Sequence, residues 1–114
     1  MQRKSSNSVQ IFYRNYSREE ILTSLREKIK TLHRKLPLKL ALLFGSYATG
    51  NFTTASDIDV LIVYRGEENK EAYSLTKKTL RLPRLELHVY SESQYEKMHH
   101  VIDKMTREGV ILYG

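Results

Sequence analysis

Two of the chain's three aspartates, Asp57 and Asp59, stand one residue apart inside an otherwise apolar segment. Such a segment favours a β-strand, in which alternate side chains share a face, so the two carboxylates would project side by side about 7 Å apart at the backbone. Carboxylates this close repel each other unless a cation compensates their charge. Magnesium prefers oxygen ligands and binds through one or two carboxylates together with substrate phosphates. The pair therefore indicates a magnesium site. A capping or turn pair is the alternative, and the apolar strand residues around it argue against that.

Gly45 and Ser46 are the second pair of residues with a chemical use. They follow an apolar run that ends at Phe44 and open a stretch rich in Gly, Ser, Thr and Asn. A glycine turn after a strand exposes backbone N–H groups that can cradle phosphate oxygens. Alone, such a turn favours a purely structural interpretation. Followed by the aspartate pair, it indicates a site that holds a phosphate and a metal ion together.

The elements that position these residues are predicted from capping and periodicity. Two capping boxes, Ser17 with Glu20 and Ser91 with Gln94, predict the starts of two helices, and Pro37 ends the first of them. Period-two alternation predicts the strands. The expected order is helix 17–36, strand 38–44, a loop or short helical turn 45–55, strand 56–64, helix 67–80, strand 84–90, helix 91–108 and strand 110–113.

Composition bounds the class of protein. The chain has 114 residues, 40% of them hydrophobic and 28% charged, which suits one globular domain but not two. We expect a single α/β (α+β) domain over residues 17–114 and a loosely ordered arm over residues 1–16. Without cysteine, a signal peptide or an apolar run of about 20 residues, the sequence predicts a cytoplasmic protein with no membrane contact. The basic residues behind the net charge of +6 are scattered, so solvated surface is favoured over a nucleic-acid footprint.

The segments 43–50 and 56–62, which carry the glycine-serine turn and the aspartate pair, resemble the signature of the DNA polymerase beta-like nucleotidyltransferase superfamily, in its minimal branch. The likeness extends to Glu86, which falls where the family places a third carboxylate, and to segment 108–113, which is similar to its closing helix and strand. The resemblance implies a nucleotidyltransferase fold, with a small mixed β-sheet of about four strands flanked by helices.

The resemblance also implies an activity and a site. Two magnesium ions would be held by Asp57, Asp59 and Glu86, which would be both the metal ligands and the catalytic residues. Gly45 and Ser46 would bind the phosphates of a nucleoside triphosphate, with ATP favoured. The reaction would move a nucleoside monophosphate, AMP for ATP, to a hydroxyl acceptor and release pyrophosphate. Glu86 would also take the proton of the attacking hydroxyl.

Some residues depart from the family pattern or stay outside the proposed site. Many relatives carry an arginine in the glycine-serine loop, which this chain lacks, so the cationic contacts to the triphosphate must come from elsewhere. Arg65, Lys77 and Lys78 are the candidates that the sequence offers. His88 shares a strand face with Glu86, but a histidine on a half-buried strand is more often structural, and we leave it out of the site.

The acceptor follows only indirectly from the sequence. Larger relatives append a domain that holds the acceptor, and this chain has no room for one, so we expect a partner macromolecule to supply that surface, with a helical HEPN-type protein favoured over nucleic acid. A homo-oligomer is left open. The alternative function is a catalytically silent, antitoxin-like protein that binds its partner with the same fold. An acidic partner could be steered by the basic residues of the arm and first helix, which are Arg14, Arg18, Arg26, Lys30 and Arg34.

Overall fold

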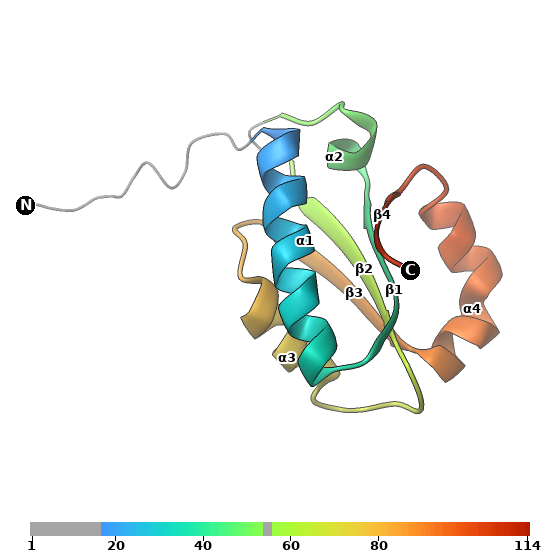
Figure 1. Cartoon of the computed structure of the whole chain (residues 1–114). Helices are drawn as coiled ribbons and strands as arrows, with labels where there is room; N and C mark the ends of the chain where they lie inside the picture. The colour runs from blue at the N-terminus through green and yellow to red at the C-terminus, as the bar shows by residue number, and fades with distance from the viewer. Residues whose placement is uncertain (1–16, 54–55) are drawn as a thin grey trace, which may run out of the picture.

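The first helix, α1 (Arg18–Lys35), begins where its capping box places it. The Ser17 hydroxyl accepts a hydrogen bond from the Glu20 N–H at 3.1 Å, and the Glu20 carboxylate accepts one from the Ser17 N–H at 2.8 Å. The computed structural model in Figure 1 describes residues 17–53 and 56–114, so the arm expected at residues 1–16 lies outside the described residues. One face of α1 is fully buried, and it consists of Ile21, Leu22, Leu25, Ile29 and Leu32.

The strands form one mixed sheet with the order β3-β2-β1-β4. Strand β1 (Leu38–Phe44) is antiparallel to both of its neighbours, β2 (Ile58–Tyr64) and β4 (Val110–Tyr113). Strand β3 (Leu85–Ser91) pairs with β2 in parallel. The predicted four-stranded mixed sheet flanked by helices is confirmed.

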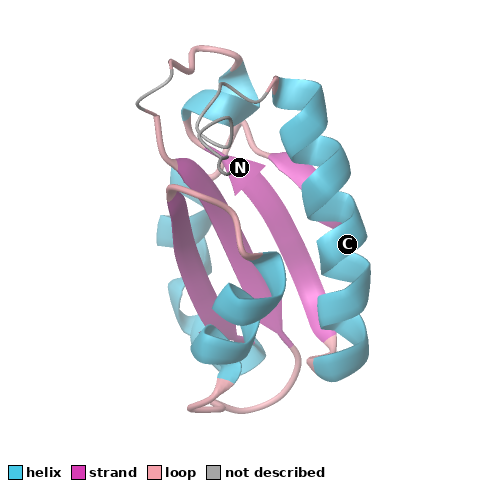
Figure 2. Cartoon of the chain, turned by 90° about the vertical axis from the view of Figure 1, so that its left-hand side faces the viewer, coloured by secondary structure: helices cyan, strands magenta, loops and turns pink. Residues whose placement is uncertain are grey.

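Helices cover both faces of this sheet (Figures 1 and 2). Helices α1 and α3 (Ala72–Leu80) pack on one face, over the larger core cluster that contains Val60 and Ile62. Helix α4 (Glu92–Met105) packs on the other face, where its Ile102 meets Leu61 and Val63 in a smaller cluster. Strand β2 is therefore buried on both sides, which fixes the orientation of every side chain along it.

Three elements differ from the sequence prediction by two residues or more at one end. Strand β2 begins at Ile58 instead of residue 56, because Ser56 is engaged in a turn with Thr53. The helix expected at 67–80 begins only at Ala72, after a turn in which the Tyr64 hydroxyl accepts from the Asn69 N–H at 2.8 Å. Helix α4 ends at Met105 and is followed by a turn at 106–108, so it is shorter than the predicted helix 91–108.

Glu92 connects three segments at one end of the sheet. Its carboxylate accepts hydrogen bonds from the Lys39 ammonium at 3.0 Å and from the Gly66 N–H at 3.2 Å. The hydrogen bond from Lys39, and then that from Gly66, lowers the pKa of Glu92. This contact ties the start of β1 and the segment after β2 to the first turn of α4.

Within the described part of the chain, none of the helices is long and apolar enough to span a bilayer.

Candidate active site

Three neighbouring strands, β1, β2 and β3, have an end at the same end of the sheet, which is the end remote from Glu92. Because β1 is antiparallel to β2, and β2 is parallel to β3, the carboxyl end of β1 lies beside the amino ends of the other two. At this end Asp59 is paired with Phe44 on one side and with Glu86 on the other. Asp57 lies immediately before β2. The topology thus brings the three predicted carboxylates, those of Asp57, Asp59 and Glu86, to one end of the sheet.

Asp59 is the most enclosed of the three carboxylates. It is half-buried on the sheet face that α4 covers further along, whereas Asp57 and Glu86 are exposed. Burial raises the pKa of Asp59, the charge of His88 lowers it, and the charges of Asp57 and Glu86 raise it further. These three neighbours are therefore close enough to Asp59 to act on its charge. The charges of Asp57 and Glu86 therefore add to the effect of burial on the pKa of Asp59.

Gly45 is held against the Asp59 carboxylate. Its backbone has φ +78° and ψ −156°, a region that is essentially restricted to glycine. A Cβ placed on Gly45 would collide with Asp59 Oδ2, so the backbone comes closer to the carboxylate than any other residue would allow. A ligand bound by the Gly45 backbone would thus be in reach of Asp59.

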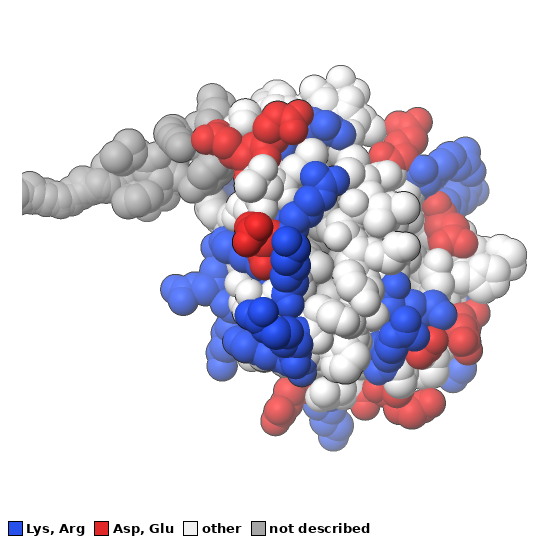
Figure 3. All heavy atoms as spheres, in the orientation of Figure 1, with Lys and Arg blue, Asp and Glu red and all other residues white. Residues whose placement is uncertain are grey.

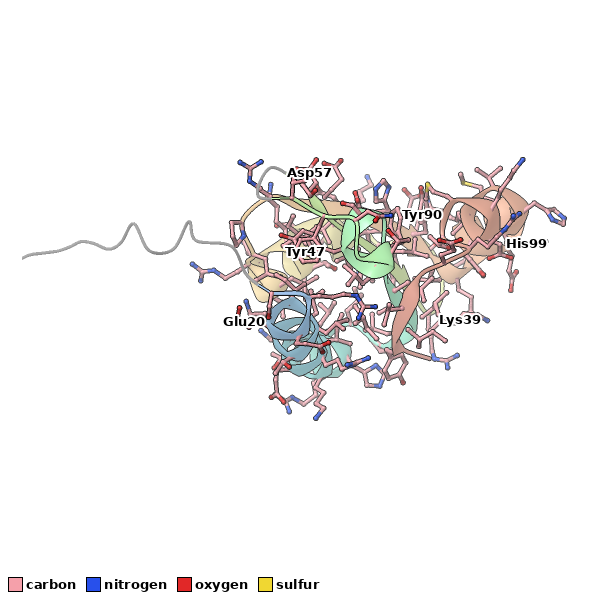
Figure 4. All side chains as sticks on the ribbon, turned by 90° about the horizontal axis from the view of Figure 1, so that it is seen from above. Glu20, Lys39, Tyr47, Asp57, Tyr90 and His99 are labelled. Atoms are coloured by element: carbon pink, nitrogen blue, oxygen red, sulfur yellow. The ribbon has the colours of Figure 1, made fainter. Side chains whose placement is uncertain are left out.

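Ser46 opens the short helix α2 (Ser46–Thr49), which is itself anchored by α1. The Ser46 hydroxyl forms no hydrogen bond with any residue of the ranges 17–53 and 56–114, which leaves it available to a ligand. The Arg18 guanidinium donates to the Tyr47 carbonyl at 3.0 Å and to the Ala48 carbonyl at 3.1 Å. Figure 4 looks down onto this end of the molecule, with Tyr47 and Asp57 labelled. Arg18, one of the residues expected to steer a partner, therefore also holds α2 in place.

A pocket of about 450 Å³ opens beside the glycine turn, between α2 and the carboxyl end of α4. We call it the Gly45 pocket. Its lining residues are Phe44, Gly45, Thr49, Lys104, Met105, Arg107 and Glu108. Lys104 and Arg107 are exposed, and neither forms an ion pair with any described residue.

Sequence reasoning missed these two cations. Arg107 and Lys104 reach Gly45 because β4 pairs with β1, Leu43 facing Val110, and so returns the end of α4 to this end of the sheet. Of the cations that the sequence offered, Arg65 follows β2 and lies six residues beyond Asp59, about 20 Å away along an extended strand. Lys77 and Lys78 belong to α3, on the face of the sheet opposite to α4.

His88 lies next to the site without being part of its carboxylate row. It pairs with Leu61 in the parallel register, one step along from Asp59 on the same face. Its ring packs against that of Phe44, with the ring centroids 5.2 Å apart. This contact gives the residue a packing role at the site.

The side chains as they stand do not enclose a metal ion. Among residues 17–53 and 56–114, no three histidine, cysteine, aspartate or glutamate side chains converge closely enough to hold one. Asp57 and Glu86 are both exposed, so their side chains can rotate towards Asp59 with little loss of packing. All three donors are carboxylates, which is the chemistry that magnesium prefers.

Comparison with known proteins gives the same architecture. The family model of the nucleotidyltransferase domain matches residues 22–112. A candidate nucleotidyltransferase from Sulfolobus solfataricus is similar in structure, with a TM-score of 0.60, 22% identity, and coverage of 83% of this chain and 81% of that one. No curated protein matches the chain.

Two toxin-antitoxin structures are also similar. One, a toxin-antitoxin with AMP-PNP, has a TM-score of 0.57 and 25% identity, covering 78% of this chain and 73% of that chain. The other, a mutant of the toxin-antitoxin MntA-HpeT, has a TM-score of 0.55 and 22% identity over the same shares of the two chains.

Proposed function

Because the chain belongs to the nucleotidyltransferase domain family, we propose that it moves AMP from ATP to a hydroxyl of a partner protein and releases pyrophosphate. The observation that carries this proposal is the contact between the Gly45 backbone and the Asp59 carboxylate, with Glu86 paired to Asp59 on the next strand. A backbone that can bind phosphate and a row of carboxylates that can bind metal thus adjoin. The resemblance to a toxin-antitoxin with AMP-PNP supports both the adenine nucleotide and a protein partner, for which a helical HEPN-type protein is our candidate.

Asp57, Asp59 and Glu86 would hold two magnesium ions. The pKa of Asp59 is raised first by burial and then by the charges of Asp57 and Glu86, and a divalent cation would offset both effects. When bound, magnesium supplies positive charge that offsets the triphosphate and the charge developing in the transition state. The three carboxylates would contribute the oxygen ligands. Because Asp59 is half-buried in a central strand, its carboxylate would fix the position of the metal ions relative to the sheet.

The triphosphate would lie on the β1 side of the carboxylates. The Gly45 backbone lets its oxygens approach without a Cβ, and the unused Ser46 hydroxyl can donate a hydrogen bond to them. Lys104 and Arg107 in the Gly45 pocket would supply the cationic contacts that the glycine-serine loop lacks. These groups together bind and orient the nucleotide.

Glu86 would act on the acceptor. The acceptor oxygen forms a bond to the α-phosphorus, and the bond from that phosphorus to the oxygen bridging to the β-phosphate breaks. The proton of the acceptor hydroxyl passes to the Glu86 carboxylate, and pyrophosphate leaves towards Gly45. Strand β3 is the edge of the sheet, so an acceptor carried on another protein can reach Glu86 from outside.

The test combines binding and transfer. We expect ATP to bind in calorimetry only when magnesium is present, and α-labelled ATP to transfer its label to a discrete protein of a cell extract. The Asp57→Asn/Asp59→Asn variant should lose transfer by about 10³-fold or more. The control is Asp103→Asn, which changes the third aspartate, an exposed residue of α4.

Other outcomes decide against the proposal. Full magnesium-dependent transfer in the double variant would remove the site assignment. Label in nucleic acid or in a small metabolite would remove the protein acceptor. A protein that binds a partner but not ATP would be the silent, antitoxin-like alternative.

A further inference from the structure

A second pocket lies at the start of β3, on the sheet face that α3 covers, whereas the carboxylates are on the face that α4 covers. It has a volume of about 450 Å³, and we call it the Arg81 pocket. Its lining residues are Lys77, Arg81, Leu82, Arg84 and Leu85. Three of the five are cationic and none is acidic, so the pocket combines positive charge with two apolar side chains. Its chemistry therefore favours an anionic group attached to an apolar or aliphatic stem.

The positive charge continues onto α1. The pKa of Lys28 is lowered, first by burial and then by the charge of Arg81, so the two cations lie close enough to repel each other. Figure 3 shows blue side chains gathered over α1 and the side of the molecule next to it. Like charges crowded in this way gain most from a bound anion, because it relieves their repulsion as well as pairing with them.

The backbone of the Arg81 pocket is unusual. Arg81 has φ +43° and Arg84 has φ +57°, and these are the only non-glycine residues with positive φ in the described part of the chain. Residues with a Cβ adopt this conformation at a cost, and such residues concentrate at functional sites. The turn between them is fixed to the site, because the Arg84 carbonyl accepts a hydrogen bond from the Ile58 N–H at 2.8 Å.

The position of the pocket matches the direction from which the acceptor must come. In an in-line displacement the attacking and leaving oxygens lie on opposite sides of the phosphorus. The leaving pyrophosphate is on the Gly45 side, so the acceptor approaches over β3, where Glu86 follows directly after Leu85. Leu85 and Glu86 point to opposite faces of β3, so the Arg81 pocket lies around this edge strand from Glu86, and an acceptor chain that crosses over β3 can reach both.

We propose that the Arg81 pocket binds an acidic segment of the acceptor protein and so places the acceptor hydroxyl beside Glu86. This inference rests on the proposed function, since it assumes a protein acceptor. Arginine pairs with a carboxylate through two parallel hydrogen bonds, while Leu82 and Leu85 pack against the aliphatic stem of a glutamate side chain. A nucleic acid is the less favoured ligand, because single strands are bound in long grooves with aromatic platforms, and no aromatic residue lines this pocket.

The test uses a double variant with a control of equal charge. Lys77→Gln/Arg81→Asn removes two of the pocket's cations, and asparagine tolerates the left-handed backbone of position 81. Lys70→Gln/Lys97→Gln lowers the net charge by the same amount at exposed positions outside the pocket. Binding of fluorescein-labelled hexaglutamate to the full chain is measured by fluorescence anisotropy at low salt. We expect about tenfold weaker binding in the pocket variant and a change within about twofold in the control.

Two results would overturn the proposal. Equal loss in both variants would mean that net charge alone attracts the peptide. Tighter binding of an RNA hexamer than of hexaglutamate, lost in the same pocket variant, would make this a nucleic-acid site. Calorimetry with magnesium and ATP on the same proteins separates the two proposals: the pocket variant should bind ATP like the unchanged chain. If no form binds ATP while hexaglutamate binding still requires the pocket, the acidic-segment site stands and the transferase proposal fails.

Discussion

At the scale of single residues, Gly45 carries the tightest constraint in the candidate site. Its φ of +78° and ψ of −156° suit only glycine, and its Cα faces Asp59 Oδ2 with no room for a Cβ. Gly50 provides a matched comparison, since it too has a positive φ, +87°, but nothing lies within 4 Å of where its Cβ would be. Substituting each glycine by alanine therefore distinguishes the effect of backbone strain alone, at Gly50, from strain combined with a collision at the site, at Gly45.

We expect Gly45→Ala to abolish magnesium-dependent ATP binding, because relief of the collision displaces either the turn or the Asp59 carboxylate. The free energy of unfolding should fall by about 2–3 kcal/mol in Gly45→Ala and by about 1 kcal/mol in Gly50→Ala, which carries backbone strain alone. Urea denaturation and calorimetry check both values. If Gly45→Ala bound ATP with unchanged affinity, the glycine turn would not be part of the nucleotide site.

The pKa of Asp59 leads to a second prediction. Because that pKa is raised in the folded protein, the folded state holds the proton more tightly than the unfolded chain does. Stability must then fall as pH rises from the ordinary aspartate pKa of about 4 through the raised value. Without magnesium, Asp59→Asn should raise the free energy of unfolding at pH 7 by about 0.5 kcal/mol, a figure reduced for solvent screening, and by nothing near pH 3.

Urea denaturation of Asp59→Asn at several pH values measures this effect, with Asp103→Asn as the control. The same variant should lose transfer, since it removes a proposed metal ligand. A variant that is less stable than the unchanged protein at pH 7 would contradict the raised pKa of Asp59.

At the scale of elements, helix α2 depends on α1 for its position. Arg18 donates to two carbonyls of α2, those of Tyr47 and Ala48, and the Tyr47 ring stacks on Phe52 with the centroids 4.3 Å apart. A four-residue helix has little stability of its own, so these contacts determine where the glycine turn lies.

Removing the anchor should therefore weaken nucleotide binding without touching the nucleotide. In Arg18→Gln we expect the KM for ATP to rise about fivefold with a smaller change in kcat, and the free energy of unfolding to fall by about 1–2 kcal/mol. Arg26→Gln, on an exposed position of the same helix, is the control and should change neither. Lower stability with an unchanged KM would show that α2 reaches its position without Arg18.

Elements encoded by local signals were predicted from the sequence, and contacts made by pairing were not. Both capping boxes and the strand that follows Pro37 appear as expected. The late start of α3 depends on the Tyr64 hydroxyl binding Asn69, a contact between side chain and loop that periodicity does not encode. Likewise, Lys104 lies near Gly45 only because β4 pairs with β1. The carboxylate row followed from strand order, whereas the roles proposed for its members remain predictions.

At the scale of the whole molecule, the two cationic pockets lie at the same end of the sheet as the three carboxylates. They concentrate part of the net charge of +6 around the candidate site. Positive clefts attract anionic ligands over distances comparable to the Debye length. An ATP triphosphate and an acidic acceptor would both benefit, one at each pocket. The charge that looked scattered in the sequence is therefore partly organised by the fold.

The contribution of the Gly45 pocket to nucleotide binding can be tested by measuring how ATP affinity depends on salt concentration. Lys104→Gln/Arg107→Gln should weaken binding of magnesium-ATP about tenfold at low ionic strength and reduce its dependence on added sodium chloride. Lys70→Gln/Lys97→Gln is the control of equal charge and should keep both the affinity and the salt dependence. Calorimetry over a salt series measures them. Equal effects in the two variants would assign the attraction to overall charge and not to the Gly45 pocket.

The Glu92 contact has a consequence for the motions of the molecule. It ties β1, the segment after β2 and α4 together at the end of the sheet remote from Gly45, and the lowered pKa of Glu92 keeps the carboxylate ionised to a more acidic pH than usual. At the other end, α2 is held by the side chain of Arg18 and lies outside the sheet ladder. Amide protons of α2 should thus exchange with deuterium far sooner than those of the buried β2 strand. Such a gradient would let the nucleotide end open and close around successive ligands while the strand that carries Asp59 keeps its place.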